Sequence, residues 1–299
     1  MIELWIPVTI LAAAIQAART TIQKYLKSSL KTNSITFVRF FYGWPFALLY
    51  LVLLLALTGA EMPPINIRFL IGCFMGGLAQ IAATSLLILS FSYRNFAVGT
   101  TYSKTEAVQT AVLGIVLFGE PLGLLAMVGI VVSLVGVVVI SSGKTGDGLS
   151  RVLLGWSEKP ALIGIASGTG FAFAALFIRW GSLSLDADFG VRAAMTLAYM
   201  TFIQTVMLGA WILIREPGEF RPILASWRSS GAVGFLSAVG SATWFTALTL
   251  QTAAYVRALG QVELILSLLI SYLFFKERSS AAEIVGMVVI VAGAILLVL

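Results

Sequence analysis

Ten apolar stretches, each of 20 residues or more, follow one another along this chain of 299 residues. A helix needs about 20 apolar residues to cross the hydrocarbon core of a bilayer, which is about 30 Å thick. The stretches lack the period-two pattern of barrel strands, so they predict membrane-spanning helices. They cover residues 4–25, 33–57, 67–90, 97–118, 122–142, 160–181, 190–214, 230–250, 254–275 and 280–299.

The composition agrees with a membrane protein. Apolar residues make up 59 % of the chain and charged residues 11 %, against about 45–50 % and about 25 % in soluble domains. The first stretch lacks a basic n-region and follows Glu3, so we expect a retained helix and not a cleaved signal peptide. We therefore expect a multi-pass protein of the inner (plasma) membrane, surrounded by lipid, as a monomer or a homodimer.

Residues that the sequence lacks exclude several classes of function. Without histidine there is no His-dependent zinc motif and no His-based catalytic triad. Asp147, Asp186 and Asp188 lie in predicted connectors, so a membrane protease with paired intramembrane aspartates is excluded. The chain has no Walker A pattern. Its net charge of +6 suggests basic loops near anionic lipid headgroups, whereas nucleic-acid binding would need that charge gathered on one surface. We expect no enzyme activity, no cofactor, no metal site and no nucleic-acid partner.

The two halves of the chain repeat each other at a fixed offset. Glu263 follows Glu106 by 157 residues, and Glu277 follows Glu120 by the same number. Acidic residues are scarce here, so two such pairs in one register indicate an internal duplication. The same offset relates Gly129 to Gly286, Gly136 to Gly293, Phe118 to Phe275, Ala97 to Ala254, Tyr42 to Tyr199, Gln80 to Ser237 and Thr84 to Ser241.

The duplication predicts the architecture. Five stretches lie on each side of a central connector, so we expect one repeat over 1–143, a linker over 144–159 and a second repeat over 160–299. An odd number of spans per repeat forces the two repeats into opposite orientations across the membrane. The expected fold is thus all-α, with ten transmembrane helices arranged as two inverted five-helix repeats. Many secondary transporters use this arrangement to place one site near the midplane.

Each half ends in a variant of one motif. The first is Tyr102-Ser-Lys-Thr-Glu106-Ala followed by Leu117-Phe-Gly-Glu120-Pro-Leu, and the second is Gly260-Gln-Val-Glu263-Leu followed by Phe274-Phe-Lys-Glu277-Arg-Ser. The chain resembles the EamA-type repeat of the drug/metabolite transporter superfamily over its whole length. Here Ala107 and Leu264 replace a proline that often follows the mid-helix acid in that family. The resemblance implies a ten-helix carrier of amino acids, sugars, nucleotide-linked metabolites or drugs.

Charged residues inside spans are functional candidates, because each costs about 2.5–3.5 kcal/mol at a helix centre on insertion scales. Glu106 and Glu263 lie near the centres of equivalent spans, and either could titrate and couple transport to protons. The alternative is that each forms a structural ion pair with Arg19 or Lys104. Lys104 and Glu106 point in different directions on a helix and should serve different neighbours. Arg19 and Lys104 together suggest an anionic substrate group, a carboxylate being the simplest.

We expect the substrate or coupling site to use polar residues on inward helix faces. Gln16 and Arg19 share one face, Tyr102 and Gln109 share the face of Glu106, and Gln80 is related to Ser237 by the repeat offset. The full set of candidates is Glu106, Glu263, Lys104, Tyr102, Gln109, Arg19, Gln16, Gln80, Gln261 and Trp244.

Several other charged residues and glycines are expected to stabilise the fold and not to bind substrate. Arg39 and Arg257 lie nearer the span ends and could extend to the membrane interface. Glu120 and Glu277 begin the turns into spans five and ten, where a helix N-terminus favours acids. The four glycines paired by the offset should allow close packing of the last helix of each repeat.

The expected function is secondary transport that exports a small polar metabolite, most plausibly an amino acid or a related carboxylate, by alternating access. A drug-efflux carrier of the same fold, with an aromatic cavity for cations, is the alternative, and a channel is a weaker one. Connectors with odd numbers hold twelve Lys and Arg and those with even numbers hold four. This count favours odd connectors in the cytoplasm and both termini outside, whereas relatives in the superfamily usually keep both termini inside.

Overall fold

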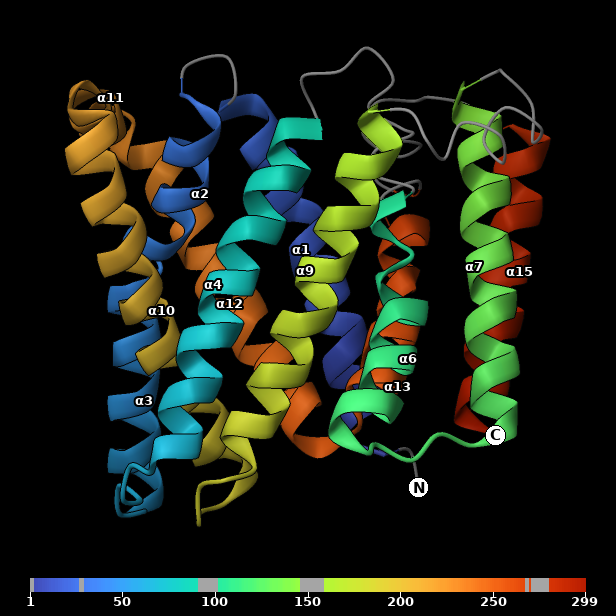
Figure 1. The fold of residues 1–299 in the computed structure, drawn as a ribbon, viewed down its shortest axis with the longest axis horizontal. Helices are drawn as coiled ribbons and strands as arrows, with labels where there is room; N and C mark the ends of the chain where they lie inside the picture. Colours follow the sequence, from blue (N-terminus) through green and yellow to red (C-terminus); the bar gives the residue numbers. More distant parts are fainter. Residues whose placement is uncertain (1–2, 27–29, 91–101, 146–158, 267–268, 270–279) are drawn as a thin grey trace.

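A computed structural model describes residues 3–26, 30–90, 102–145, 159–266, 269 and 280–299, and these residues form helices and no strand. The helices run up and down beside one another (Figure 1). Of the residues paired by the repeat offset, Ala97, Phe275 and Glu277 lie outside the described residues. The elements are α1 (Trp5–Leu26), α2 (Thr32–Phe41), α3 (Trp44–Thr58), α4 (Ile67–Ser90), α6 (Glu106–Phe118), α7 (Leu124–Thr145), α9 (Lys159–Ser182), α10 (Phe189–Arg215), η2 (Pro217–Glu219), α11 (Phe220–Ala225), α12 (Trp227–Leu250), α13 (Ala253–Leu259), η3 (Gly260–Val262) and α15 (Ala281–Val298).

Five of the described helical segments are long and apolar enough to cross a membrane. They are Thr32–Thr58, Ile67–Ser90, Ala161–Ser182, Phe189–Arg215 and Trp227–Leu250, and Glu106–Phe118, Leu124–Val139 and Ile284–Leu296 are shorter apolar helices. The all-helical prediction is confirmed. The count of ten spans remains a prediction, because α1 is not among these five and part of the predicted ninth span lies outside the described residues.

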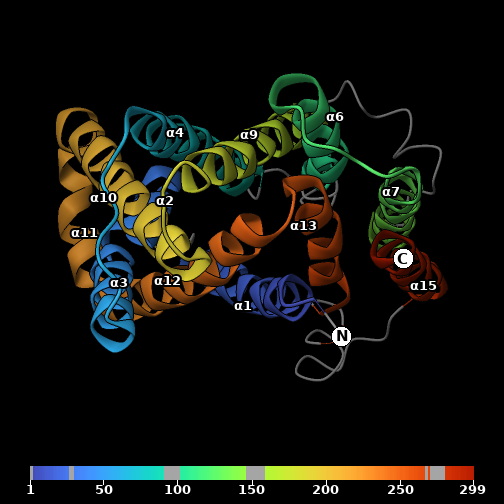
Figure 2. The same cartoon turned by 90° about the horizontal axis from the view of Figure 1, so that it is seen from below.

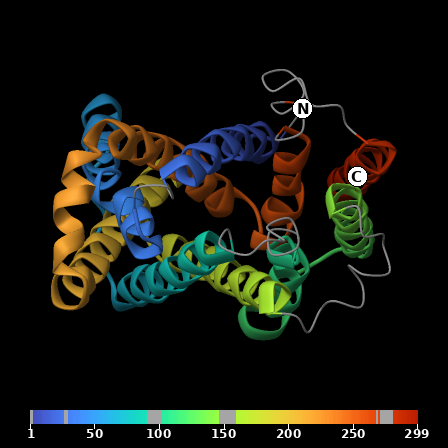
Figure 3. The ribbon, with the colours of Figure 1, turned by 90° about the horizontal axis from the view of Figure 1, so that it is seen from above.

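Seen end-on, the helices surround a central region in two walls (Figures 2 and 3). Helices α4 and α9 pack together in one wall, and α1 and α12 pack together in the other. Helix α10 lies against α2, α3, α4 and α12 at one end, while α6 and α13 meet at the other end. The pair α7 and α15 stands beyond α6 and α13, and the chain enters α1 and leaves α15 at the same edge of the bundle (Figure 1).

The second predicted span is bent and not one straight helix. It consists of α2 and α3, which meet at Tyr42 and Gly43. The bend packs against α12, because a Cβ on Gly234 would collide with Tyr42 and a Cβ on Gly43 would lie 3.2 Å from the Gly234 carbonyl oxygen. Small residues thus let backbones approach closely here, as is common between membrane helices. The bend places the last turn of α2 against the central region.

The contact between α7 and α15 is reciprocal. A Cβ on Gly136 would lie 2.8 Å from the Gly286 carbonyl oxygen, and a Cβ on Gly293 would lie 2.7 Å from that of Gly129. The repeat offset of 157 exchanges these two contacts. Two-fold symmetry produces such a pattern, in which each surface contacts its own equivalent. The predicted packing role of these glycines is confirmed.

A polar joint holds four helices together at the edge where α6 ends. Glu120 accepts a bond of 2.9 Å from Arg179 Nε of α9 and one of 3.2 Å from the backbone N–H of Ala253. The Arg179 Nη1 donates to the carbonyl oxygens of Leu248 and Gln251, at 2.8 and 2.7 Å, and so satisfies the end of α12. Burial raises the pKa of the Glu120 carboxyl, and the neighbouring Arg179 opposes that rise.

The joint modifies the expectation for Glu120. The sequence predicts this acid at the entrance to the fifth span, whose helix α7 begins at Leu124. Its side chain instead meets the first N–H of α13, in the second repeat. The electrostatic reason is the expected one, since a carboxylate is stabilised at a helix N-terminus. The helix N-terminus that Glu120 binds is that of α13 and not that of α7.

The glycine contact between α7 and α15 predicts a loss of stability for Gly136→Ala. The added methyl would lie 2.7 Å from Ile290 Cγ1, and overpacking of this kind costs about 1–3 kcal/mol. Gly231→Ala is the matched control, because nothing lies within 4 Å of its added Cβ and alanine favours a helix. Thermal denaturation in detergent should show a lower midpoint for Gly136→Ala alone. Equal midpoints would contradict the close contact.

The polar joint predicts that Arg179→Gln destabilises the protein. The substitution removes the cation from Glu120 and leaves carbonyl groups at the end of α12 without their donor, which costs about 1–3 kcal/mol for each buried unsatisfied group. The denaturation midpoint in detergent should fall, and the double variant Arg179→Gln with Glu120→Gln should recover part of the loss. A midpoint equal to that of the parent protein would show that the joint contributes nothing.

Candidate functional site

The two acids found at the repeat offset are both buried inside the bundle and not against lipid. Glu263 Oε2 accepts bonds from Lys104 Nζ at 2.6 Å and from Gln16 Nε2 at 2.8 Å. Gln16 Oε1 in turn accepts a bond of 3.0 Å from the indole nitrogen of Trp244. Side chains from α1 and from the segment before α6 therefore bind this carboxylate directly, and Trp244 of α12 is linked to it through Gln16.

Glu106 has a different cationic neighbour. Its Oε1 lies 3.9 Å from Arg257 Nη1, and the Arg257 guanidinium stacks 4.9 Å above the ring centroid of Trp244. Trp244 therefore contacts a neighbour of each acid: Gln16, which binds Glu263, and Arg257, which lies beside Glu106. Its ring also packs directly on Gly260, where a Cβ would collide with it. Lys104 and Glu106 do serve different partners, as the sequence predicts.

The backbone is irregular just before each acid. Helix α6 begins at Glu106 after a turn over Lys104 and Thr105, and Glu263 follows the 3-10 segment η3 (Gly260–Val262). The side chain of Gln261 donates a bond of 3.3 Å to the Lys104 carbonyl oxygen, and these two residues are related by the offset of 157. Broken helices at corresponding positions of two repeats are typical of transporter binding sites, because irregular backbone is tolerated inside a membrane where it lines a cavity.

Arg19 lies beside this group of charges without a salt bridge of its own among the described residues. It is 5 % exposed, and its Nε has no hydrogen-bond partner there. The charge of Glu263 attracts its guanidinium and that of Arg257 repels it. We call Arg19, Lys104, Glu106, Arg257 and Glu263 the charge cluster.

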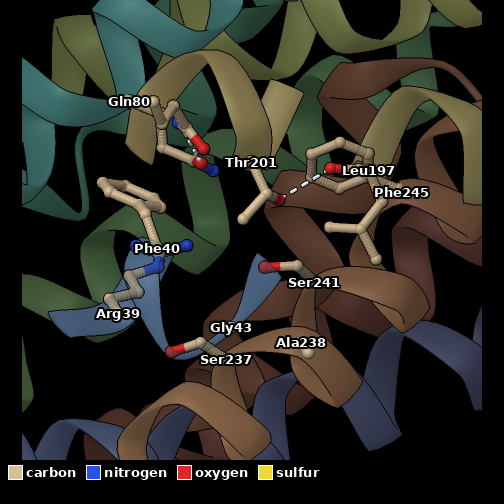
Figure 4. Close-up of a pocket in the computed structure, with 11 residues that line it drawn as sticks. Arg39, Phe40, Gly43, Gln80, Leu197, Thr201, Ser237, Ala238, Ser241 and Phe245 are labelled. Atoms are coloured by element: carbon tan, nitrogen blue, oxygen red, sulfur yellow. Dashed lines mark hydrogen bonds between the residues drawn. The ribbon is translucent and has the colours of Figure 1, made fainter. Parts of the chain in front are cut away.

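A small polar pocket lies next to Arg39 (Figure 4). Its volume of about 10 Å³ leaves room for about one water molecule. Arg39 Nη1 donates a bond of 3.0 Å to Thr84 Oγ1, and the charges of Arg19 and Arg257 repel it. The lining residues are Arg39, Phe40, Gly43, Gln80, Leu197, Thr201, Gln204, Ser237, Ala238, Ser241 and Phe245.

The pocket is built from residues that the repeat offset relates. Phe40 and Leu197 are 157 residues apart, and so are Gln80 and Ser237. Equivalent positions of the two repeats therefore face the same space, as at a two-fold axis. The charge breaks the symmetry, because the position equivalent to Arg39 is Thr196.

Not all predicted site residues lie in the charge cluster or in the pocket beside Arg39. Lys104, Gln16, Gln261 and Trp244 contact the surroundings of the acids, and Gln80 lies in the pocket, where its Oε1 accepts a bond of 2.8 Å from Gln204. Tyr102 lies in the segment before α6, and its carbonyl oxygen accepts a bond of 2.6 Å from Thr105 Oγ1.

Gln109 needs a correction, because its amide is engaged by α9 and not by the charge cluster. Its Oε1 accepts a bond of 2.6 Å from Thr169 Oγ1, and its Nε2 donates one of 2.8 Å to Thr105 Oγ1. The expected shared face of Tyr102, Glu106 and Gln109 assumes a continuous helix. The helix begins only at Glu106, so Tyr102 is not one turn before Glu106 on it.

Arg39 and Arg257 also need a correction. Both are buried, at 5 % and 6 % exposed, and do not extend to the membrane interface as expected. Arg39 is in the last turn of α2 beside the bend, and Arg257 is in the last turn of α13 before η3. Gly43 and Gly260, which follow these arginines by four and three residues, are the sequence signals of the two breaks.

A larger hollow of about 420 Å³ is open and apolar. It lies between α1, α3 and α12, and its lining includes the exposed side chains of Phe46, Leu49 and Phe235. It carries no charged lining residue, so it lacks the polar groups that orient a ligand. Among the described residues, no three His, Cys, Asp or Glu lie together as a metal site would require.

Comparisons with known proteins agree with this architecture. A crystal structure matches the fold with a TM-score of 0.72 at 15 % sequence identity, covering 99 % of this chain and 96 % of the other. No curated protein matches the chain. The sequence model of the EamA-like transporter family matches twice, over residues 3–142 and 159–299. The chain, with one such repeat in each half, therefore belongs to the EamA-like transporter family, the membrane transporters of the drug/metabolite transporter superfamily.

Proposed function

We propose that the protein is a secondary-active transporter that exports small polar metabolites, of which amino acids and related carboxylates fit best. The observation that carries the proposal is the charge cluster, to which both repeats contribute buried ionisable side chains. Ionisable residues inside a membrane protein are costly, and they mark substrate or ion pathways. The cluster contains more cations than acids, which favours an anionic group on the substrate.

Alternating access accounts for the arrangement of the two edges of the bundle. One edge is closed by the Glu120–Arg179 joint. At the other edge, Glu219 accepts bonds of 3.1 Å from Lys31 and 2.8 Å from Ser34. Burial works against ionisation of Glu219, but these bonds outweigh it and hold its pKa below the usual value. Each joint ties the two repeats together at one edge of the bundle, so a transport cycle would have to break the joints in turn.

Movement of two inverted five-helix repeats against each other would break one joint at a time. The reciprocal contact of α7 and α15 supports such a two-fold relation. The proposal includes ten spans, with repeats at 1–143 and 160–299 joined by residues 144–159, in the inner (plasma) membrane and as a monomer or homodimer. The count of basic residues supports both termini outside.

Proton coupling is the role proposed for Glu106 and Glu263. Each carboxylate lies beside a cation, so protonation of either acid would free that cation to bind an anionic substrate. Substrate release would then let the ion pair form again with loss of the proton. Gln16, Trp244 and Gln261 orient Glu263 and Lys104 through the bonds described above.

Drug efflux is the alternative, with lipophilic cations as substrates. The apolar hollow between α1, α3 and α12 is an observation that favours it. The interior charges argue against it, since the cations Arg19, Lys104 and Arg257 of the charge cluster, together with Arg39, repel a cationic ligand. We therefore prefer the carboxylate proposal.

A transport screen tests the proposal directly. Purified protein in lipid vesicles should exchange labelled amino acids or carboxylates in a saturable way, faster when a pH difference is imposed. Empty vesicles and the Gly231→Ala variant serve as controls. Transport of cationic dyes in preference to carboxylates would support the efflux alternative, and unsaturable flux would indicate a channel.

Glu263→Gln is predicted to abolish coupling and to destabilise the protein. It leaves the half-buried Lys104 ammonium without its partner, and breaking a fully buried pair, which is the upper bound here, costs about 3–5 kcal/mol. The double variant Lys104→Gln with Glu263→Gln keeps the net charge and should regain stability. If Glu263 carries the proton, transport by the double variant should be slow and independent of the pH difference. Full proton-driven transport by the double variant would limit Glu263 to a structural role.

A further inference from the structure

Of the four cations in the bundle interior, three buried arginines and the half-buried Lys104, two have no acidic side chain within salt-bridge distance among the described residues. Glu263 pairs with Lys104 at 2.6 Å, and Glu106 lies 3.9 Å from Arg257. Arg19 and Arg39 remain, each 5 % exposed. A buried ion without a partner is strongly unfavourable, so these two guanidinium groups are either costly defects or parts of a binding site.

Arg39 differs sharply from an arginine that holds the fold together. Arg179 binds Glu120 and the carbonyl oxygens at the end of α12. The Arg39 guanidinium, with five N–H donors, makes one hydrogen bond in the described structure, to Thr84 Oγ1 at 3.0 Å. Its remaining donors are available to the pocket that it lines.

The rest of the pocket supplies more donors and no acid. Ser237 Oγ is buried and has no partner in the described structure, and Ser241 lines the same space. Gln80 accepts the bond from Gln204 through its oxygen, which leaves its amide nitrogen as a donor. Hydroxyl and amide donors around a guanidinium match the acceptor oxygens of a carboxylate or phosphate.

Helix α1 carries Arg19 past the same part of α12 that lines the pocket. Gln16, one turn before Arg19, accepts the bond of 3.0 Å from Trp244 of α12, and Ile15 lies 3.1 Å from a Cβ on Gly240. The pocket residues Ser237 and Ser241 belong to this part of α12. The like charges of Arg19 and Arg39 also repel each other, and a molecule with two anionic groups would balance the excess of two cations over acids among the described interior residues.

Resting on the proposed transport function, we propose that the substrate is a dianion, a dicarboxylate or a phosphate ester, bound between Arg19 and an anion subsite formed by Arg39, Gln80, Ser237 and Ser241. The subsite has a volume of about 10 Å³ in this structure, so a dianion would require it to open. Separation of α4 from α12, which carry Gln80 and Ser237, would open it. The substrate bridges the two repeats when bound, because these residues belong to different repeats.

The test is binding of defined anions to the purified full-length protein in detergent, measured by titration calorimetry. Succinate represents dicarboxylates, glycerol phosphate represents phosphate esters, and lactate and leucine are the monoanion and zwitterion controls. Succinate or glycerol phosphate should bind at least about tenfold more tightly than lactate, as a charge-assisted hydrogen-bonded pair provides. The tighter of the two identifies the class.

Arg39→Gln should weaken dianion binding at least about tenfold and change lactate binding less than threefold. Arg39→Lys keeps the charge and should retain part of the affinity. Arg39→Gln should also raise the denaturation midpoint of the unliganded protein, because it removes an unpaired buried charge, whereas Arg179→Gln lowers that midpoint. A lowered midpoint with unchanged dianion affinity would show Arg39 to be structural and overturn the proposal.

The two proposals fail in different ways. If vesicles transport leucine or lactate while neither dianion binds, the dianion proposal is overturned and the transport function stands. If dianions bind with the expected dependence on Arg39 but no solute crosses the membrane, the transport function fails and the anion subsite stands.

Discussion

The excess of buried positive charge governs the interior of this protein. Among the described residues, the interior holds four cations, Arg19, Arg39, Lys104 and Arg257, and two acids, Glu106 and Glu263, which pair with Lys104 and Arg257. Water cannot solvate these charges in a packed bundle, so each must find an opposite charge or a ring of dipoles. The short Lys104–Glu263 bond, the stacking of Arg257 on Trp244 and the bond from Arg39 to Thr84 are partial solutions. An anionic substrate, as proposed, would complete the balance of charge.

The irregular backbone before each acid follows from the same constraint. A straight helix would keep its N–H and C=O groups bonded to one another and would carry its charged side chain on a fixed face. The turn before Glu106 and the 3-10 segment before Glu263 instead point the two acids and Lys104 into one region. The small residue Gly260 then allows the Trp244 ring to pack over the break.

The apolar stretches predict the helices well, because length and hydrophobicity alone decide which segments lipid accepts. The repeat offset also predicts the partners of α7 and the burial of both acids. The depth of Arg39 and Arg257 is not predictable in the same way. Position within a span gives depth only if the helix is straight and uncovered, and a bend at Gly43 and a break at Gly260 place both arginines inside. The contacts of Gln109 depend on where α6 begins, which the apolar pattern does not fix.

The backbone of the two repeats follows two-fold symmetry more closely than their charged residues do. Glu106 and Glu263 are equivalent, and so are Phe40 and Leu197 in the pocket. The cations are not, since the positions equivalent to Arg19, Arg39 and Lys104 are Leu176, Thr196 and Gln261. A symmetric site would accept a substrate in two opposite orientations. In the proposed site, cations placed mainly in one repeat would select one orientation of an anionic substrate, while the equivalent acids would offer a proton site in each half. The asymmetry of the charges would then give the substrate a direction that the symmetric backbone alone does not supply.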